Sequence, residues 1–236
     1  MKTVKSNKGF TLIELLIAMA VASLLMAGVY KIFSSQINLS ITQEQISSVQ
    51  QNLRSAMYLL EKEIRMSGYG GTFTGGSATG FTAATVDGMT FQYLTNSLDP
   101  TQTQSTITYS LADGDGDGDN DLMRSVVGGG AATSVADNIE QIEFFYTYTD
   151  VAGATQQDTD PPTPADVGRI QSVQVSILAR SSKSIPGSQT GKQYPTNPSG
   201  TVWGNTATVG TDTITENYND GVYRRYSTST ILCRNL

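Results

Sequence analysis

Residues 8–30 read KGFTLIELLIAMAVASLLMAGVY, an almost uninterrupted apolar run that follows a short basic segment. Glu14 is the only charged residue between Phe10 and Tyr30. An α-helix from Phe10 to Tyr30 spans about 31 Å, which is enough to cross the hydrocarbon core of a membrane. Lysines that precede such a run favour a cytoplasmic N-terminus, so we expect the bulk of the chain to lie outside the cytoplasm.

A helical pattern continues well beyond the apolar run. Gly and Pro are absent from residues 31–64, and within 46–64 apolar residues recur at steps of three or four, which is the spacing of one helix face. Glycines that begin at Gly68 favour a stop. The sequence therefore predicts one helix over residues 10–67, apolar all round in its first half and with one apolar face in its second half.

The rest of the chain is predicted to form antiparallel β-sheet with long loops. Apolar and polar side chains alternate in several segments, which places one strand face on a core and the other in water. The apolar face of the helix is the natural partner of the inner face, so the predicted fold class is α+β. The predicted strands are Met89–Leu94, Ser105–Leu111, Leu122–Val127, Ile139–Thr149, Ile170–Arg180 and Val222–Leu232. The predicted loops are 68–88, 150–168 and 181–221.

The composition excludes several classes of site. Histidine is absent from the 236 residues, which rules out Ser-His-Asp and Cys-His nucleophile systems and His-ligated metals. Cys233 is the only cysteine, so neither an internal disulfide nor a cysteine metal cluster can form. A net charge of −6 disfavours a nucleic-acid partner. We predict a protein that is not an enzyme, with no catalytic residues.

The residues around Gly9 carry a specific motif. A basic leader ends in Gly9, Phe10 follows it, and Glu14 is the fifth residue of the remaining chain. This arrangement closely resembles the type IV prepilin leader. Two simpler interpretations are a plain membrane anchor and a removable secretory signal cleaved at the Ala-Val-Ala sequence of residues 20–22. Glu14 argues against the secretory signal, because a carboxylate in the middle of its apolar region weakens insertion.

The resemblance implies that a membrane-embedded prepilin peptidase cuts between Gly9 and Phe10 and that Phe10 is then N-methylated. Loss of the three leader lysines changes the formal charge from −6 to −9. A lone carboxylate inside a membrane is costly and needs a partner. The α-amino group freed at Phe10 of a neighbouring subunit is an available cation, which makes Glu14 the candidate assembly residue. Alternatively, Glu14 snorkels to the interface, because it lies less than two turns from the N-terminus.

Less specific motifs in the rest of the chain resemble those of the minor pilins of the PilW family. They lie in residues 65–69, 107–111, 122–124, 135–140, 174–180, 223–225 and 234–236. The resemblance implies a type IV pilin-like fold with four parts. These parts are a leader peptide at 1–9, an apolar membrane or filament-core helix at 10–33, an amphipathic helix on the sheet at 34–67, and a β-rich extracytoplasmic domain at 68–236.

Proteins of this family are low-abundance pilus subunits, so the resemblance implies a minor pilin that primes pilus assembly as part of a tip complex. The implied partners are the prepilin peptidase, other minor pilins, the major pilin and a tip adhesin, with roles in cell adhesion or twitching motility. The precursor is expected in the inner membrane and the mature chain in the extracellular pilus, at its tip. Two alternatives remain: a J-type minor pseudopilin of a type II secretion system, and a membrane-anchored Ca²⁺-dependent binding module that never enters a filament.

One segment between two predicted strands has the composition of a metal-binding loop. Five aspartates alternate with glycine or asparagine, and carboxylates at this spacing repel one another. Ca²⁺ takes about six to eight oxygen ligands, and glycine permits the turns that bring them together. Arg124 stands where an EF-hand has its bidentate Glu. We predict a structural Ca²⁺ site, with a solvated acidic hairpin tip as the alternative; the candidate ligands are Asp113, Asp115, Asp117, Asp119 and Asp121.

The sequence leaves the roles of two residues, Cys233 and Trp203, open. Cys233 lies near the end of the last predicted strand and is either a small buried residue or a thiol that pairs with another subunit. Trp203 is the only tryptophan and lies in the predicted loop 181–221. It either anchors a partner protein or holds its own loop against the domain.

Overall fold

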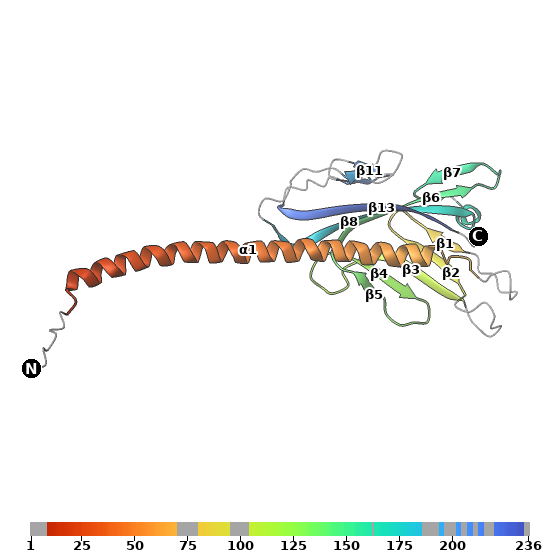
Figure 1. The fold of residues 1–236 in the computed structure, drawn as a ribbon. Coiled ribbons are helices and arrows are strands. Elements are labelled where there is room, and N and C mark those ends of the chain that lie inside the picture. The colour runs from red at the N-terminus through yellow and green to blue at the C-terminus, as the bar shows by residue number, and fades with distance from the viewer. Residues whose placement is uncertain are drawn as a thin grey trace, which may run out of the picture. The chain divides into compact units, whose positions relative to one another are not determined.

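The computed structural model describes most of the chain as an α+β protein, which confirms the predicted fold class. The described residues are 9–69, 80–94, 104–161, 163–185 and 220–233, together with the backbone of four short strands between residues 194 and 214. The chain divides into two compact units, Met1–Glu44 and Gln45–Leu236, and the longest element is helix α1 (Leu12–Ile64; Figure 1).

The first unit contains the apolar part of α1. Its large apolar side chains are exposed from Phe10 to Ile41, with fractional exposures between 45% and 91%. By length and composition, α1 is the one helix among the described residues that could cross a membrane. Exposed apolar surface on this scale is typical of a segment that contacts lipid or other protein chains.

The second unit is built on the C-terminal part of α1. Of the apolar residues at the helical spacing, Val49, Leu53, Leu60 and Ile64 are buried, whereas Ile46 and Met57 are half-buried. Ala56 joins the buried residues in the core. Ala56 was not counted among the apolar residues that predicted this helix face, because the small side chain of alanine is only weakly hydrophobic. After Ile64 the chain leaves the helix through turn hydrogen bonds, and Gly68 adopts a φ of 75°, a conformation that suits glycine.

The strands of the second unit form two larger antiparallel sheets (Figure 1), where the sequence predicted one. The five-stranded sheet follows chain order and contains β1 (Phe81–Ala84), β2 (Met89–Tyr93), β3 (Ser105–Ala112), β4 (Asp121–Val126) and β5 (Thr133–Ala136). The four-stranded sheet has the order β13 (Val222–Leu232), β8 (Ile170–Ser184), β6 (Ile139–Thr149) and β7 (Thr155–Asp158).

All six predicted strands are present, and the elements that the sequence missed lie mostly in predicted loops. β7 has the sequence TQQD and is exposed throughout, so it lacks the alternation that identifies a strand. The other missed elements are β1, β5, the helical turn α2 (Pro164–Val167), and two hairpins formed by β9 (Tyr194–Pro195) with β10 (Val202–Trp203) and by β11 (Ala207–Val209) with β12 (Asp212–Ile214).

The chain passes from the first sheet to the second at Asn138, the only non-glycine residue with a positive φ (58°) in the described structure. Asparagine tolerates this left-handed conformation better than most residues. The Asn138 N–H donates to Asp121 Oδ1 at 2.9 Å, and the Ile139 N–H donates to the Asn120 carbonyl at 2.8 Å. These two bonds hold the switch between β5 and β6 against the start of β4.

A buried ion pair joins α1 to the five-stranded sheet. Arg124 on β4 binds the Glu63 carboxylate through two nitrogens, at 2.8 Å and 3.0 Å. Tyr109 on β3 donates its hydroxyl to Glu63 Oε2 at 2.5 Å. Glu63 is 6% exposed, and a carboxylate at this depth requires such partners. The helix therefore meets the sheet in one rotational setting, with Glu63 turned toward β3 and β4.

Candidate functional site

The N-terminal motif lies at the start of α1 and forms a capping box. Thr11 precedes the first helical residue, and its N–H and its hydroxyl both donate to Glu14 Oε2 at 2.9 Å. The Glu14 N–H in turn approaches Thr11 Oγ1 at 3.4 Å. A threonine followed three residues later by glutamate is the signature of this reciprocal cap. The spacing of Thr11 and Glu14 is present in the sequence, where Glu14 was interpreted only as a charge within an apolar segment.

Gly9 has no structural requirement to be glycine within the described chain. A Cβ atom at this position would meet nothing within 4 Å, and Gly9 is not among the residues with positive φ. Phe10 is also 91% exposed. The fold of the described residues therefore does not require glycine at position 9.

The structure brings together three of the five predicted metal ligands. Asp113, Asp115 and Asp117 lie in the loop between β3 and β4, and each offers a carboxylate oxygen within 4.8 Å of the others. All three are exposed. Backbone N–H groups of the same loop donate to them: Gly116 to Asp113 at 2.7 Å, and Asp117 to Asp115 at 3.1 Å.

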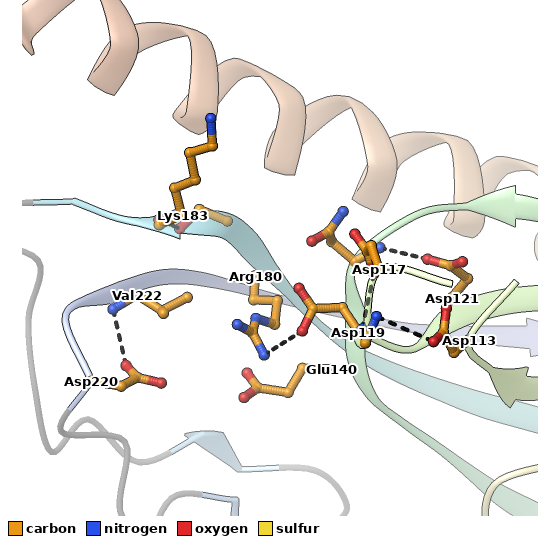
Figure 2. A network of polar contacts seen from close by, with 12 residues as sticks. Asp113, Asp117, Asp119, Asp121, Glu140, Arg180, Lys183, Asp220 and Val222 are labelled. Atoms are coloured by element: carbon orange, nitrogen blue, oxygen red, sulfur yellow. Dashed lines mark hydrogen bonds and ion pairs between the residues drawn. The ribbon is translucent and has the colours of Figure 1, made fainter. Parts of the chain in front are cut away.

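The other two aspartates have different partners. Asp121, 1% exposed, accepts hydrogen bonds from the N–H groups of Gly114 at 3.0 Å and of Asn138 at 2.9 Å. Asp119 forms an ion pair of 2.9 Å with Arg180 on β8 (Figure 2). These contacts anchor the aspartate loop, residues 113–121, to both sheets. The fold uses Asp119 and Asp121 to position the loop that presents the other three carboxylates.

The electrostatics of the aspartate loop favour a positive ligand. The N–H of Asp117 lowers the pKa of Asp115, but loss of hydration and the negative charges of Asp117, Asp121 and Asp113 outweigh this bond. The pKa of Asp115 is therefore raised above its ordinary value. A cation placed among these carboxylates would reverse the repulsion that causes the shift.

The sequence left the roles of Cys233 and Trp203 open. In the structure, Cys233 is half-buried beside Ser67. Burial raises the pKa of its thiol to about 12, although a hydrogen bond with Ser67 acts in the opposite direction. A thiol with so high a pKa is a poor nucleophile at neutral pH, which favours the interpretation as a small buried residue. The side chain of Trp203 lies outside the described residues.

Comparison with known proteins gives one clear result at the N-terminus. Residues 4–30 match the family described as the prokaryotic N-terminal methylation motif. Curated proteins give no match. Among solved structures, the chain is similar to the type IV-like pilin TTHA1219 from Thermus thermophilus, with 15% identity and a TM-score of 0.46 over 79% of this chain and 95% of that chain. The N-terminal segment, with Gly9, Phe10 and Glu14, thus carries a prokaryotic N-terminal methylation motif.

Proposed function

We propose that the chain is a type IV pilin, made as a membrane precursor and processed by a prepilin peptidase between Gly9 and Phe10, with N-methylation of Phe10. The observation that carries the proposal is the methylation motif at residues 4–30, at the head of a long helix. The open space around Gly9 supports recognition by a processing enzyme, because packing does not require glycine there.

The exposed apolar surface of α1 supports the same proposal. In the precursor this part of the helix lies in the inner membrane, and in the mature pilus it lies among the helices of neighbouring subunits. Both environments remove the exposed side chains from water, which is favourable by about 25 cal/mol for each Å² of apolar surface buried. In the filament, Glu14 pairs with the α-amino group of Phe10 from a neighbouring subunit.

The more specific proposal is a minor pilin of the PilW type. Such a subunit helps to prime pilus assembly, acts without catalysis, and sits in a tip complex with other minor pilins, the major pilin below them and a tip adhesin. The motifs spread over residues 65–236 support this assignment. A J-type minor pseudopilin of a type II secretion system has the same build. It is distinguished by the proteins that copurify with it: minor pilins and an adhesin, or components of a secretion channel.

The decisive experiment is the intact mass and N-terminal sequence of the protein recovered from membranes and sheared filaments of its native host. The proposal expects a filament species that begins at N-methylated Phe10. A matched variant, Gly9→Val, should fold normally and remain uncleaved in the membrane. A wild-type chain that begins at Met1 or at Ser23 in both fractions would overturn the proposal and favour an anchored binding module or a secreted protein.

We also propose that the aspartate loop binds Ca²⁺ through Asp113, Asp115 and Asp117, with a structural role. The short separations among their carboxylate oxygens and the raised pKa of Asp115 support this proposal. Ca²⁺ prefers carboxylate and carbonyl oxygens and accepts irregular geometry. Bound Ca²⁺ would stiffen the loop between its anchors at Asp119 and Asp121. A comparison of melting temperatures with Ca²⁺ and with a chelator tests this site.

A further inference from the structure

The four-stranded sheet has one edge that is much longer than the other sheet edges. β13 has 11 residues and ends this sheet, whereas the edge strands β1, β5 and β7 have four residues each. Across the described strands, the hairpins β9–β10 and β11–β12 included, β13 pairs only with β8. From Arg225 to Leu232 the ladder with β8 is unbroken by a bulge, and the segment contains no proline. Bulges and prolines are common devices that keep an edge strand from pairing with another chain.

A groove of about 470 Å³ lies between α1 and this edge. Arg225 and Ser227 stand opposite Ala179 and Ile177 of β8 in the ladder, and directly opposed residues share a sheet face. Ala179 and Ile177 belong to the core that includes α1, so Arg225 and Ser227 lie on the helix side of the sheet. The groove is lined by Gln50, Leu53, Arg54, Met57, Tyr58, Glu61, Arg225, Tyr226 and Ser227.

The groove carries positive charge that the described part of the chain does not neutralise. Arg54 and Arg225 form no ion pair with any described residue. The one acidic lining residue, Glu61, is bound to Arg65. Guanidinium groups bind carboxylates with two parallel hydrogen bonds. Tyr58, 68% exposed, adds an aromatic surface beside these charges.

We propose that the β13 edge and this groove form a docking site for an extended, acidic segment of a neighbouring subunit. The segment adds a strand to β13, directs carboxylates to Arg54 and Arg225, and packs an apolar side chain on Tyr58. Main-chain hydrogen bonds supply affinity in this mode, and the side-chain contacts supply specificity. The inference rests on the proposed function, because filament assembly brings the neighbouring subunit within reach.

The test measures binding of a fluorescent peptide, in which glutamate alternates with valine, to the full chain in nonionic detergent. We expect saturable binding, and no binding by a peptide with lysine in place of glutamate. The variant Arg54→Gln/Arg225→Gln should weaken binding about five- to tenfold, as expected for two partly solvated ion pairs. The matched control Lys62→Gln/Lys183→Gln removes the same charge away from the groove and should bind like the wild type. Near-UV circular dichroism checks that both variants remain folded.

Two N-methylated peptides separate strand addition from simple charge attraction. One is methylated on its glutamate nitrogens and the other on its valine nitrogens, and alternate N–H groups of a strand point to opposite sides. One form should lose binding at least about tenfold, and the other should bind like the parent peptide. Equal binding by both forms, or no effect of the arginine substitutions, would overturn the inference.

If the peptide fails to bind although filaments contain chains that begin at Phe10, the docking site is refuted and the proposed function stands. If the peptide binds as expected but no filament contains the chain, the proposed function is refuted, and the groove binds an acidic partner other than a pilus subunit.

Discussion

Glu14 closes the first turn of its own helix by accepting two hydrogen bonds from Thr11, one from the backbone N–H and one from the hydroxyl, both at 2.9 Å. The residue therefore already has a partner before any neighbouring subunit is present. A capping box satisfies N–H groups that the first turn of a helix otherwise leaves without a partner. Glu14 is thus a candidate for two roles, as a cap within the chain and as a charge between chains.

Substitutions at these two positions separate the two roles. Glu14→Gln keeps a hydrogen-bond acceptor for Thr11 but removes the charge, whereas Thr11→Ala removes the hydroxyl of the cap at a cost of about 1 kcal/mol and keeps the charge. If the charge drives assembly, Glu14→Gln should lower the filament fraction at least about tenfold, and Thr11→Ala should leave it nearly unchanged. Immunoblots of sheared filaments and membranes measure this, and intact masses check that processing is normal. Loss of filaments in Thr11→Ala that equals or exceeds the loss in Glu14→Gln would contradict the role of the charge, because only Thr11→Ala removes part of the cap.

The buried pair between Glu63 and Arg124 should dominate the stability of the junction between α1 and the sheet. Glu63→Gln leaves the Arg124 guanidinium without its countercharge, and because the Arg124 side chain is 23% exposed, the loss should cost about 2–3 kcal/mol, below the value for a fully buried pair. The control is Glu61→Gln, which breaks an exposed pair with Arg65 and should cost below about 1 kcal/mol. Urea unfolding of the full chain in nonionic detergent, followed by near-UV circular dichroism, compares the two. Similar free energies of unfolding for both variants would contradict the assignment.

Asp220 should make stability depend on pH in a defined direction. The Arg224 guanidinium binds Asp220 at 2.6 Å and 2.9 Å and holds the pKa of that carboxyl well below its usual 3.8. A depressed pKa in the folded state adds stability above the pKa of the unfolded chain, and this stability is lost as the pH falls below it. Asp220 is 43% exposed, so solvent screening limits the effect to about 1 kcal/mol.

The variant Asp220→Asn isolates this contribution. The difference in unfolding free energy between wild type and variant should be largest near pH 6–7 and should shrink steadily below about pH 4, because the Asp220 carboxylate of the unfolded wild type takes up a proton there before the folded one does. Urea unfolding at a series of pH values measures the difference. A difference that stays constant from neutral pH to about pH 3 would show that the carboxylate charge is not its source.

Removal of Ca²⁺ should lower the melting temperature of the chain if the aspartate loop binds it. A ligand at 100 times its Kd stabilises the folded state by about 2.7 kcal/mol, which corresponds to roughly 5–10 °C for a chain of this size. Asp115→Asn should abolish the shift. Asp119→Asn should lower the melting temperature without Ca²⁺, because it breaks the Arg180 pair, yet retain most of the shift. A melting temperature that is the same with chelator and with Ca²⁺ would refute the site.

The alternation of apolar and polar residues predicted two strands with the same bounds that the structure has. Ile139–Thr149 and Val222–Leu232 were predicted at the residues where β6 and β13 begin and end. Both are long and are bounded by turn residues, so their pattern is read within one segment. β7 carries no such pattern because both of its faces meet solvent. It forms because β6 offers it backbone partners from Tyr146 to Thr149, which no local pattern reports.

At the candidate sites, too, the sequence pattern does not report contacts with distant segments of the chain. The motif of Gly9, Phe10 and Glu14 is contiguous, so the sequence was sufficient to find it. The five aspartates of residues 113–121 were found by composition, but their division into three clustered and two anchoring carboxylates depends on Arg180 and Asn138, which lie far along the chain. Spacing alone treats all five as equivalent ligands.

The sequence by itself determined the long helix, the methylation motif and the antiparallel strands, because these depend on periodicity and on neighbours within a few residues. Only the tertiary structure decided how the strands divide into two sheets, which carboxylates face one another, and that Arg54 and Arg225 line one groove. These properties depend on contacts between segments that are distant in the chain. Such contacts exist only after burial of the core has set the position of α1 (from Gln45 onward) against the strands.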